Sequence, residues 1–143
     1  MDTRIYGATD LKTRRTELLG AAMKDRALIR AVDGTALVLT RLARVEAQEC
    51  VATWSLRLHA AARGAPSPEM AWLEVLDDDD RALCIDELWT ALAEVRAGDD
   101  RSVFDELLRA WRTTAATLDD PRRREVLLGA FDEDDFVAVT RPE

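Results

Sequence analysis

The dipeptide Asp33-Gly34 is the feature that most constrains the fold, because it separates two short runs rich in β-forming residues, 27–32 and 35–40. An Asp-Gly pair between two such runs is the strongest short-range signal for a β-hairpin. Glycine accepts the positive φ that a type I′ turn requires. The sequence therefore predicts an antiparallel hairpin near the amino terminus, closed by a type I′ turn at Asp33-Gly34.

The residues ahead of this hairpin predict a strand and a helix. Residues 4–7 suit a short strand, and Thr9 or Asp10 suits the N-cap of a helix that extends to Lys24. Apolar residues recur in this helix at helical spacing, at Leu11, Leu18, Leu19 and Ala22. Together with the hairpin, these elements predict a compact β-α-β-β module.

The chain beyond the hairpin is expected to be mostly helical. Residues 42–62 predict one uninterrupted helix with an apolar stripe of Leu42, Val45, Cys50, Trp54, Leu56 and Leu58. Gly64, Pro66 and Pro68 then break the pattern. We therefore divide the chain into a module with its following helix at 1–62, a linker at 63–68 and a helical region at 69–143.

Further helices are expected in the last of these regions. A short helix around 69–76 precedes the acidic run 77–80, and that run favours the start of a helix ending at Gly98, because carboxylates stabilise a helix amino terminus. Asp99 or Asp100 starts the next helix, to Leu118, and Asp120-Pro121 the last, to Gly129. The tail 136–140 alternates like a strand. The fold class is α+β.

The charge is divided between the two halves of the chain. The net charge of −8, taken alone, argues against nucleic acid, because an acidic chain repels phosphates. Residues 1–65, however, carry 11 basic and 7 acidic side chains, whereas residues 66–143 carry 9 and 21. A front of net charge +4 and a back of −12 indicate two different partners.

No catalytic or metal-binding pattern is present in the sequence. The one histidine, His59, has no nucleophile or acid at a spacing typical of a catalytic group, and Cys50 and Cys84 are far apart, as expected of buried free thiols. The run 77–80 lacks the alternating ligands of a calcium loop, which favours its helix-start role. We predict no enzyme, no cofactor and no metal. No apolar run approaches the length of a membrane span, so we expect a cytoplasmic protein without a membrane partner.

Four tryptophans are the most informative apolar residues. Each lies at helical spacing beside leucine or valine, which favours packing in a core. Aromatic side chains also dominate interface energetics, so Trp72, Trp89 and Trp111 are candidates for binding a protein partner, with Trp72 the first of them.

The first third of the chain resembles the Phd/YefM (prevent-host-death) antitoxin family. The similarity lies in a strand followed by the helix start Ala8-Thr9-Asp10-Leu11-Lys12, and then in a hairpin that extends from Ile29 through Gly34 to Leu37-Val38-Leu39. This chain adds a long helical carboxy-terminal extension. The family usually has an arginine pair before the hairpin glycine, where this chain has Ala31-Val32 with Arg30 just before them.

The resemblance implies a homodimer that reads operator DNA with its amino-terminal modules and inhibits a protein toxin with its carboxy-terminal segment. Arg4, Lys12, Arg14 and Arg15 are DNA-binding candidates, because charged donors near a helix start can meet phosphates. Arg30 is a further candidate, as a displaced substitute for the arginine pair that the family has in its hairpin. The same basic residues could instead form a solvated helix face that balances Asp10 and Glu17. We therefore expect an antitoxin-like transcriptional autoregulator.

Two other functions are compatible with the sequence. One is an interaction or scaffold protein that keeps the dimer module without binding DNA and uses its acidic half as the working surface. The other is a solitary regulator that has no toxin partner. Sequence patterns alone do not separate these possibilities.

Overall fold

The hairpin forms in a computed structural model that describes residues 4–129, apart from the side chains of Leu127 and Leu128. Strand β2 (Arg26–Arg30) pairs antiparallel with β3 (Ala36–Thr40), and β1 (Ile5–Gly7) pairs parallel with β2. The sheet order is therefore β1-β2-β3, followed by helices, which confirms an α+β fold. The tail 130–143, with the strand expected at 136–140 and the acidic residues 132–135, lies outside the described residues.

The turn of the hairpin is not the type I′ turn that we predicted. Ala31 N–H donates to Thr35 O at 2.9 Å, so three residues close the hairpin rather than two. Only Gly34 among these three has a positive φ, +88°, whereas type I′ needs positive φ at both central residues. The Asp33 carboxylate accepts from the Thr35 amide at 2.9 Å, which fixes the loop and lowers the pKa of Asp33.

The single helix expected between the first two strands is broken in two. Helix α1 (Asp10–Thr13) ends and α2 (Arg15–Lys24) begins at Arg14, whose φ and ψ of −127° and 31° are not helical. The Asp10 carboxylate does not cap α1. It accepts from Gly7 N–H at 2.7 Å and so fixes the turn that follows β1.

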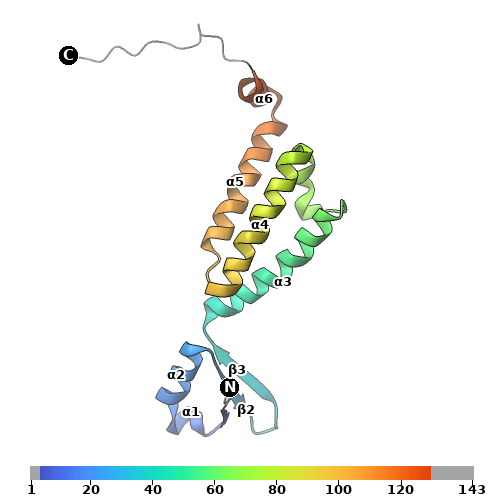
Figure 1. Ribbon diagram of the computed structural model, residues 1–143. Helices are drawn as coiled ribbons and strands as arrows, with labels where there is room; N and C mark the ends of the chain where they lie inside the picture. Colours follow the sequence, from blue (N-terminus) through green and yellow to red (C-terminus); the bar gives the residue numbers. More distant parts are fainter. Residues whose placement is uncertain (1–3, 130–143) are drawn as a thin grey trace, which may run out of the picture.

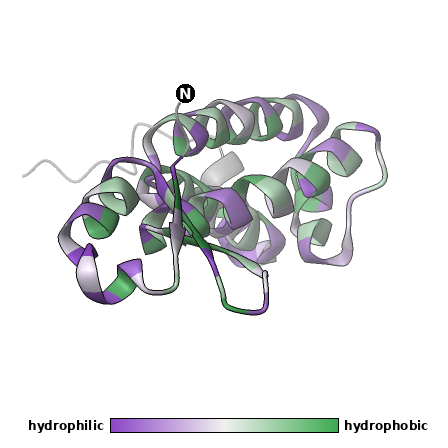
Figure 2. Ribbon diagram, turned by 90° about the horizontal axis from the view of Figure 1, so that it is seen from below, coloured by the Kyte–Doolittle hydropathy of each residue, from purple (hydrophilic) through white to green (hydrophobic). Residues whose placement is uncertain are grey.

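The two short helices cover one face of the sheet. The core of this module consists of Tyr6, Leu18, Ala22, Ala27 and Ile29. Leu11 and Leu19, which we expected in this core, are 47% and 49% exposed, because a sheet with strands of three to five residues offers room for few helical side chains. The opposite face of the sheet has no covering element among the described residues (Figures 1 and 2).

Helix α3 (Leu42–Ala62) spans the predicted range but presents a different face to the core. Its buried residues are Ala47, Cys50, Trp54, Leu58 and Ala61. Leu42 and Leu56, both placed in the expected stripe, are 71% and 74% exposed. At 100° per residue they lie off the face that the buried set defines, so their assignment to the core was wrong.

The helical body continues with the 3-10 helix η1 (Pro68–Val75), then α4 (Asp78–Gly98), α5 (Ser102–Asp119) and α6 (Pro121–Leu128). The Asp77 carboxylate accepts from Asp80 N–H at 2.8 Å, which confirms that the first acidic run starts a helix. Asp120 caps α6 in the same way, accepting from Arg122 N–H at 3.0 Å. These caps explain why each helix begins close to where its carboxylate predicted.

The boundary between the two parts of the molecule lies before α3, not after it. The buried side chains of α3 belong to one core with those of η1, α4 and α5, at whose centre the rings of Trp54 and Phe104 meet edge to face at 5.3 Å. The expected linker 63–68 is therefore a turn inside the helical body. Figure 1 shows the amino-terminal module at one end of the molecule and α6 at the other.

Both cysteines are buried free thiols, as predicted, and the exposed Cys50 fraction is only 4%. Burial raises the pKa of both thiols, that of Cys84 to about 12. Within residues 4–129, no helix has the length and apolar character needed to span a membrane.

Two glycine substitutions test the hairpin and are expected to change stability in opposite directions. Gly34→Ala places an L-residue at φ +88° and should lower the free energy of unfolding by about 1 kcal/mol. Gly20→Ala, inside α2, should raise it by about 0.5–1 kcal/mol. Neither added Cβ has an atom within 4 Å, so the comparison isolates backbone conformation. Urea unfolding followed by circular dichroism measures both, and a change of the same sign in the two variants would contradict the prediction.

Candidate nucleic-acid interface

The break between α1 and α2 gathers three of the five predicted DNA-binding residues. Lys12, Arg14 and Arg15 line a polar cleft of about 610 Å³, together with Thr13, Thr16 and Glu17. In a continuous helix Lys12 and Arg15, at positions i and i+3, would already share a face, whereas Arg14 would point away from them. The non-helical backbone at Arg14 lets its side chain line the same cleft as the other two.

The cleft lies at the amino terminus of α2, and this terminus has no side-chain cap. The first amides of a helix lack partners within the helix and carry partial positive charge. Basic side chains around such amides form an arrangement that suits phosphate oxygens. The cleft therefore has the chemistry of an anion-binding site.

Glu17 neutralises part of this basic cluster. It pairs with Arg4 at 2.5 Å and with Arg14 at 3.1 Å, and the Arg4 guanidinium also lies 5.7 Å from the centre of the Tyr6 ring. All three charged side chains are about half exposed, so each pair contributes at most about 1 kcal/mol and can exchange for another anion. Lys12 and Arg15 form no ion pair with any residue in 4–129.

Arg30 does not join the cleft. Ala27 and Ile29 face the helices, so alternation along β2 places Arg30 on the opposite face of the sheet. There it is exposed and lies in register with Gly7 and Ala36. The structure thus brings together Arg4, Lys12, Arg14 and Arg15 and separates Arg30 from them.

The three candidate tryptophans have different surroundings. Trp111 is half-buried against the helical core, and its Nε1 donates to Glu87 at 2.9 Å. Trp72 is also half-buried against that core, and its Nε1 is buried without an acceptor in the described part of the chain. Trp89 is 37% exposed and lines a groove of about 480 Å³ between α3 and α4. Of the three, Trp89 is the most accessible to a partner.

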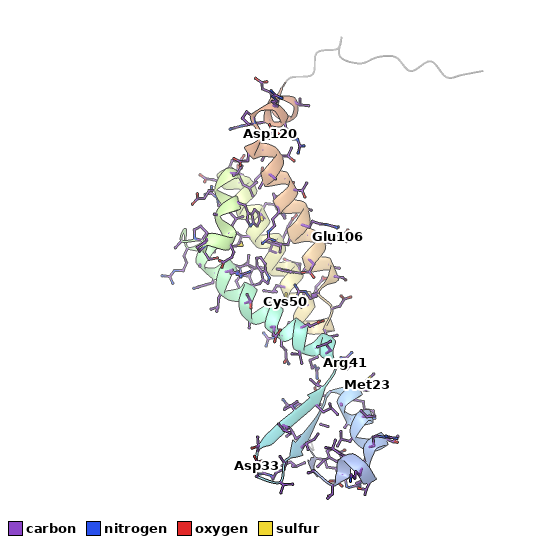
Figure 3. All side chains as sticks on the ribbon, turned by 180° about the vertical axis from the view of Figure 1, so that it is seen from behind. Met23, Asp33, Arg41, Cys50, Glu106 and Asp120 are labelled. Atoms are coloured by element: carbon purple, nitrogen blue, oxygen red, sulfur yellow. The ribbon has the colours of Figure 1, made fainter. Side chains whose placement is uncertain are left out.

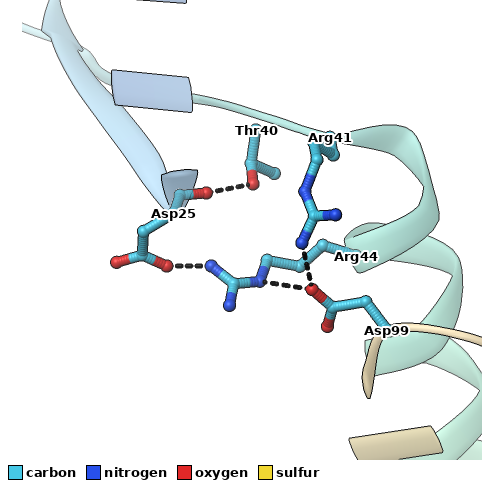
Figure 4. Close-up of polar contacts among 5 residues, drawn as sticks. All are labelled: Asp25, Thr40, Arg41, Arg44 and Asp99. Carbon is cyan, nitrogen blue, oxygen red and sulfur yellow. Dashed lines mark hydrogen bonds and ion pairs between the residues drawn. The ribbon is translucent and has the colours of Figure 1, made fainter. Parts of the chain in front are cut away.

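The cleft is held relative to the helical body by an ionic junction (Figure 4). Arg44 pairs with Asp25, which follows α2, and its Nε lies 3.2 Å from the carboxylate of Asp99, which follows α4. Arg41 donates to the same Asp99 oxygen at 2.7 Å, and the Thr40 hydroxyl donates to the Asp25 carbonyl at 2.6 Å. One arginine of α3 therefore joins the module to the α4–α5 connection.

No charged residue of this junction was expected at a site, and Asp99 was expected only as a possible helix start. Helix α4 ends at Gly98, as predicted, and Asp99 follows it with a φ of 54°, the one positive φ outside glycine in residues 4–129. Its side chain is only 13% exposed. The partners are separated by 55 and 58 residues, a spacing that no local pattern reveals.

Removal of the Asp99 carboxylate should destabilise the molecule. Asp99→Ala should lower the free energy of unfolding by about 2 kcal/mol, because it leaves two arginines without their buried partner and keeps a Cβ at positive φ. Asp99→Asn should cost about 1 kcal/mol, since asparagine tolerates this φ and still accepts a hydrogen bond. Asp105→Ala is the matched control. It removes the exposed pair with Arg101 and should cost less than about 1 kcal/mol. Equal losses from Asp99→Ala and Asp105→Ala in urea unfolding would contradict a special role for the junction.

Comparison with known proteins gives no identification: no known family, curated protein or solved structure matches this chain.

Proposed function

We propose that this chain is an antitoxin-like transcriptional autoregulator. In this proposal the chain forms a homodimer, binds operator DNA through its amino-terminal module and neutralises a protein toxin through its helical body. The observation that carries the proposal is the helix break at Arg14, which collects Lys12, Arg14 and Arg15 around the uncapped amino terminus of α2. The similarity of Ala8–Lys12 and of the hairpin to Phd/YefM antitoxins supports it.

Phosphate contact explains this arrangement better than a general solvated surface does. Three basic side chains and free helix amides around one cleft are a recurring way to bind a phosphate backbone. Such contacts provide affinity and position, whereas base recognition needs a donor that reaches a groove, and Arg14 or Arg15 would supply it. Arg30, on the other face of the sheet, has no place in this contact set.

One observation favours the alternative of a scaffold protein that does not bind DNA. Glu17 already pairs with Arg4 and Arg14, as expected for a helix face whose charges balance one another. In this alternative only Lys12 and Arg15 remain for an anion. Lys12 and Arg15 are therefore the basic residues whose removal distinguishes the DNA-binding function from the scaffold function.

The DNA-binding proposal is tested with Lys12→Ala/Arg15→Ala. Each lost phosphate contact lowers the slope of log affinity against log salt by about 0.9, so the double variant should lose about 1.8 of that slope and bind roughly 50-fold more weakly at about 0.1 M salt. Fluorescence anisotropy with a duplex from the chain's own upstream region measures both quantities.

Arg63→Ala/Arg96→Ala is the matched control, because it removes two exposed charges from the helical body. It should leave the affinity within about twofold, since charges far from the contact are screened. Absence of salt-dependent binding by the unmodified protein, or equal weakening in the two double variants, would contradict DNA binding through the cleft and leave the scaffold function.

The uncovered face of the sheet supports the proposed homodimer. Ile5, Leu28 and Val38 form one row across the three strands, and Ile5 and Val38 are 55% and 59% exposed. β3 is an edge strand, and Leu37 on it is 50% exposed. An apolar sheet face beside a free edge is a surface that a second copy would cover symmetrically.

Val38→Lys tests the dimer. A lysine in the middle of the apolar row should convert the dimer to a monomer, because a charge buried in an interface without a partner is strongly unfavourable. Leu56→Lys, at a position 74% exposed on α3, is the control and should leave the dimer intact. Sedimentation velocity measures the mass, and a Val38→Lys dimer as stable as that of the unmodified protein would rule out this interface.

The groove beside Trp89 is the proposed contact for the toxin. It lies between the end of α3 and a stripe of α4 that includes Ala82, Ile85 and Trp89 at helical spacing. Asp78, Arg81 and Asp86 also line it, and Arg81 pairs with Asp78 at 3.3 Å, so the walls are apolar and Asp86 is the acidic residue of the rim that this arginine leaves free. An amphipathic helix with basic flanks would complement such a groove.

A further inference from the structure

A basic groove lies on the helical body, although this half of the chain is acidic on average. The groove has a volume of about 340 Å³ and is lined by Arg109 and Arg112 of α5, by Arg123 of α6, and by Leu108, Thr113 and Thr117. Residues 109–124 hold five of the nine basic side chains found after residue 65, with only two acidic ones. The average charge of this half therefore hides a local excess of positive charge.

The three arginines of the groove are available to bind an anion. Arg109 pairs with Glu106 at 3.7 Å and Arg123 with Asp120 at 3.6 Å, both long contacts within one helix between exposed side chains. Figure 3 shows Glu106 on α5 and Asp120 where α5 gives way to α6. Such pairs are worth little in water and exchange readily. Arg112 has no ion pair within the described chain.

The threonine hydroxyls of the groove are already engaged and do not bind the anion. The Thr113 hydroxyl donates to the Arg109 carbonyl at 2.9 Å, and the Thr117 hydroxyl to the Thr113 carbonyl at 2.8 Å. A hydroxyl has a single hydrogen to donate, so recognition of an anion falls to the guanidinium groups. Arg112 and Arg57 of α3 also lie 5.9 and 4.9 Å from the ring centre of Trp54, which extends the positive face onto α3.

We infer that this groove is a binding site for a run of carboxylates, and that its occupant is the acidic segment 132–135 of the same chain. That segment reads Asp-Glu-Asp-Asp, four consecutive carboxylates that complement three arginines. Guanidinium groups bind carboxylates with paired hydrogen bonds, more strongly than neutral donors do. This binding does not depend on the proposed DNA-binding function.

The geometry of α6 permits this contact. From Arg123 to Gly129 the helix advances by about 9 Å, at about 1.5 Å per residue. Three extended residues beyond Gly129 span about 10 Å, which lets Asp132 return to the level of Arg123. A tether this short gives an effective concentration in the millimolar range, so a weak carboxylate contact is sufficient for occupancy.

An occupied groove would keep the helical body from binding other polyanions. The tail would neutralise the arginines of the groove. The net charge of −12 in this half would then repel nucleic acid, because the groove would no longer offer a basic surface. The binding of DNA would be confined to the cleft at the other end of the molecule (Figure 1).

Paramagnetic relaxation in the full-length chain tests the inference. A nitroxide is attached at Ala138→Cys, where it reacts selectively because Cys50 and Cys84 are 4% and 0% exposed. Amide signals of 109–117 should broaden at about 0.02 M salt and recover at about 1 M, where the Debye length is about 3 Å. Amides of β3, at the other end of the molecule, should not broaden.

Two variants locate the contact. Arg112→Gln/Arg123→Gln and the fourfold neutralised tail Asp132→Asn/Glu133→Gln/Asp134→Asn/Asp135→Asn should each remove the broadening of α5, whereas Arg63→Gln/Arg96→Gln should keep it. Unchanged chemical shifts elsewhere verify that each variant folds. Absence of broadening on α5 in the starting protein, or broadening that survives high salt or either neutralisation, would overturn the inference.

Discussion

The carboxylate of Asp99 accepts two guanidinium groups from the start of α3 while its own backbone lies in the left-handed region. An L-residue adopts that conformation at a cost, and the cost is offset here by ion pairs to a side chain that is almost buried. Arg44 extends the same contact to Asp25 in the amino-terminal module. The position of the module on the helical body depends on this set of charges.

Helix α3 is the element that connects the two parts of the molecule. Arg41 precedes this helix and Arg44 lies in its first turn, and the rest of the helix contributes Cys50, Trp54 and Leu58 to the helical core. A helix that is packed along most of its length transmits a change at one end to the other as a rigid unit.

The distribution of charge follows from helix construction as much as from binding. Asp77 and Asp120 cap helices and Asp99 binds arginines, so part of the negative charge serves folding. The basic groove and the basic cleft lie at opposite ends of the molecule, on α5–α6 and on α1–α2. A count of charges over the two halves of the sequence detects the basic first half and the acidic second half. It does not detect the basic groove inside the acidic half.

The sequence alone determined the hairpin, the positions where helices start and the buried state of the cysteines, because turns, caps and apolar spacing are local. It did not determine the turn type, which depends on the bond from the Thr35 amide to the Asp33 carboxylate, or the break at Arg14, whose backbone is not helical. Only the tertiary structure placed α3 in the helical core, separated Arg30 from the cleft and brought Asp99 to Arg44. These relations join residues far apart in the chain, and no periodicity or local spacing records which distant surfaces will be buried against each other.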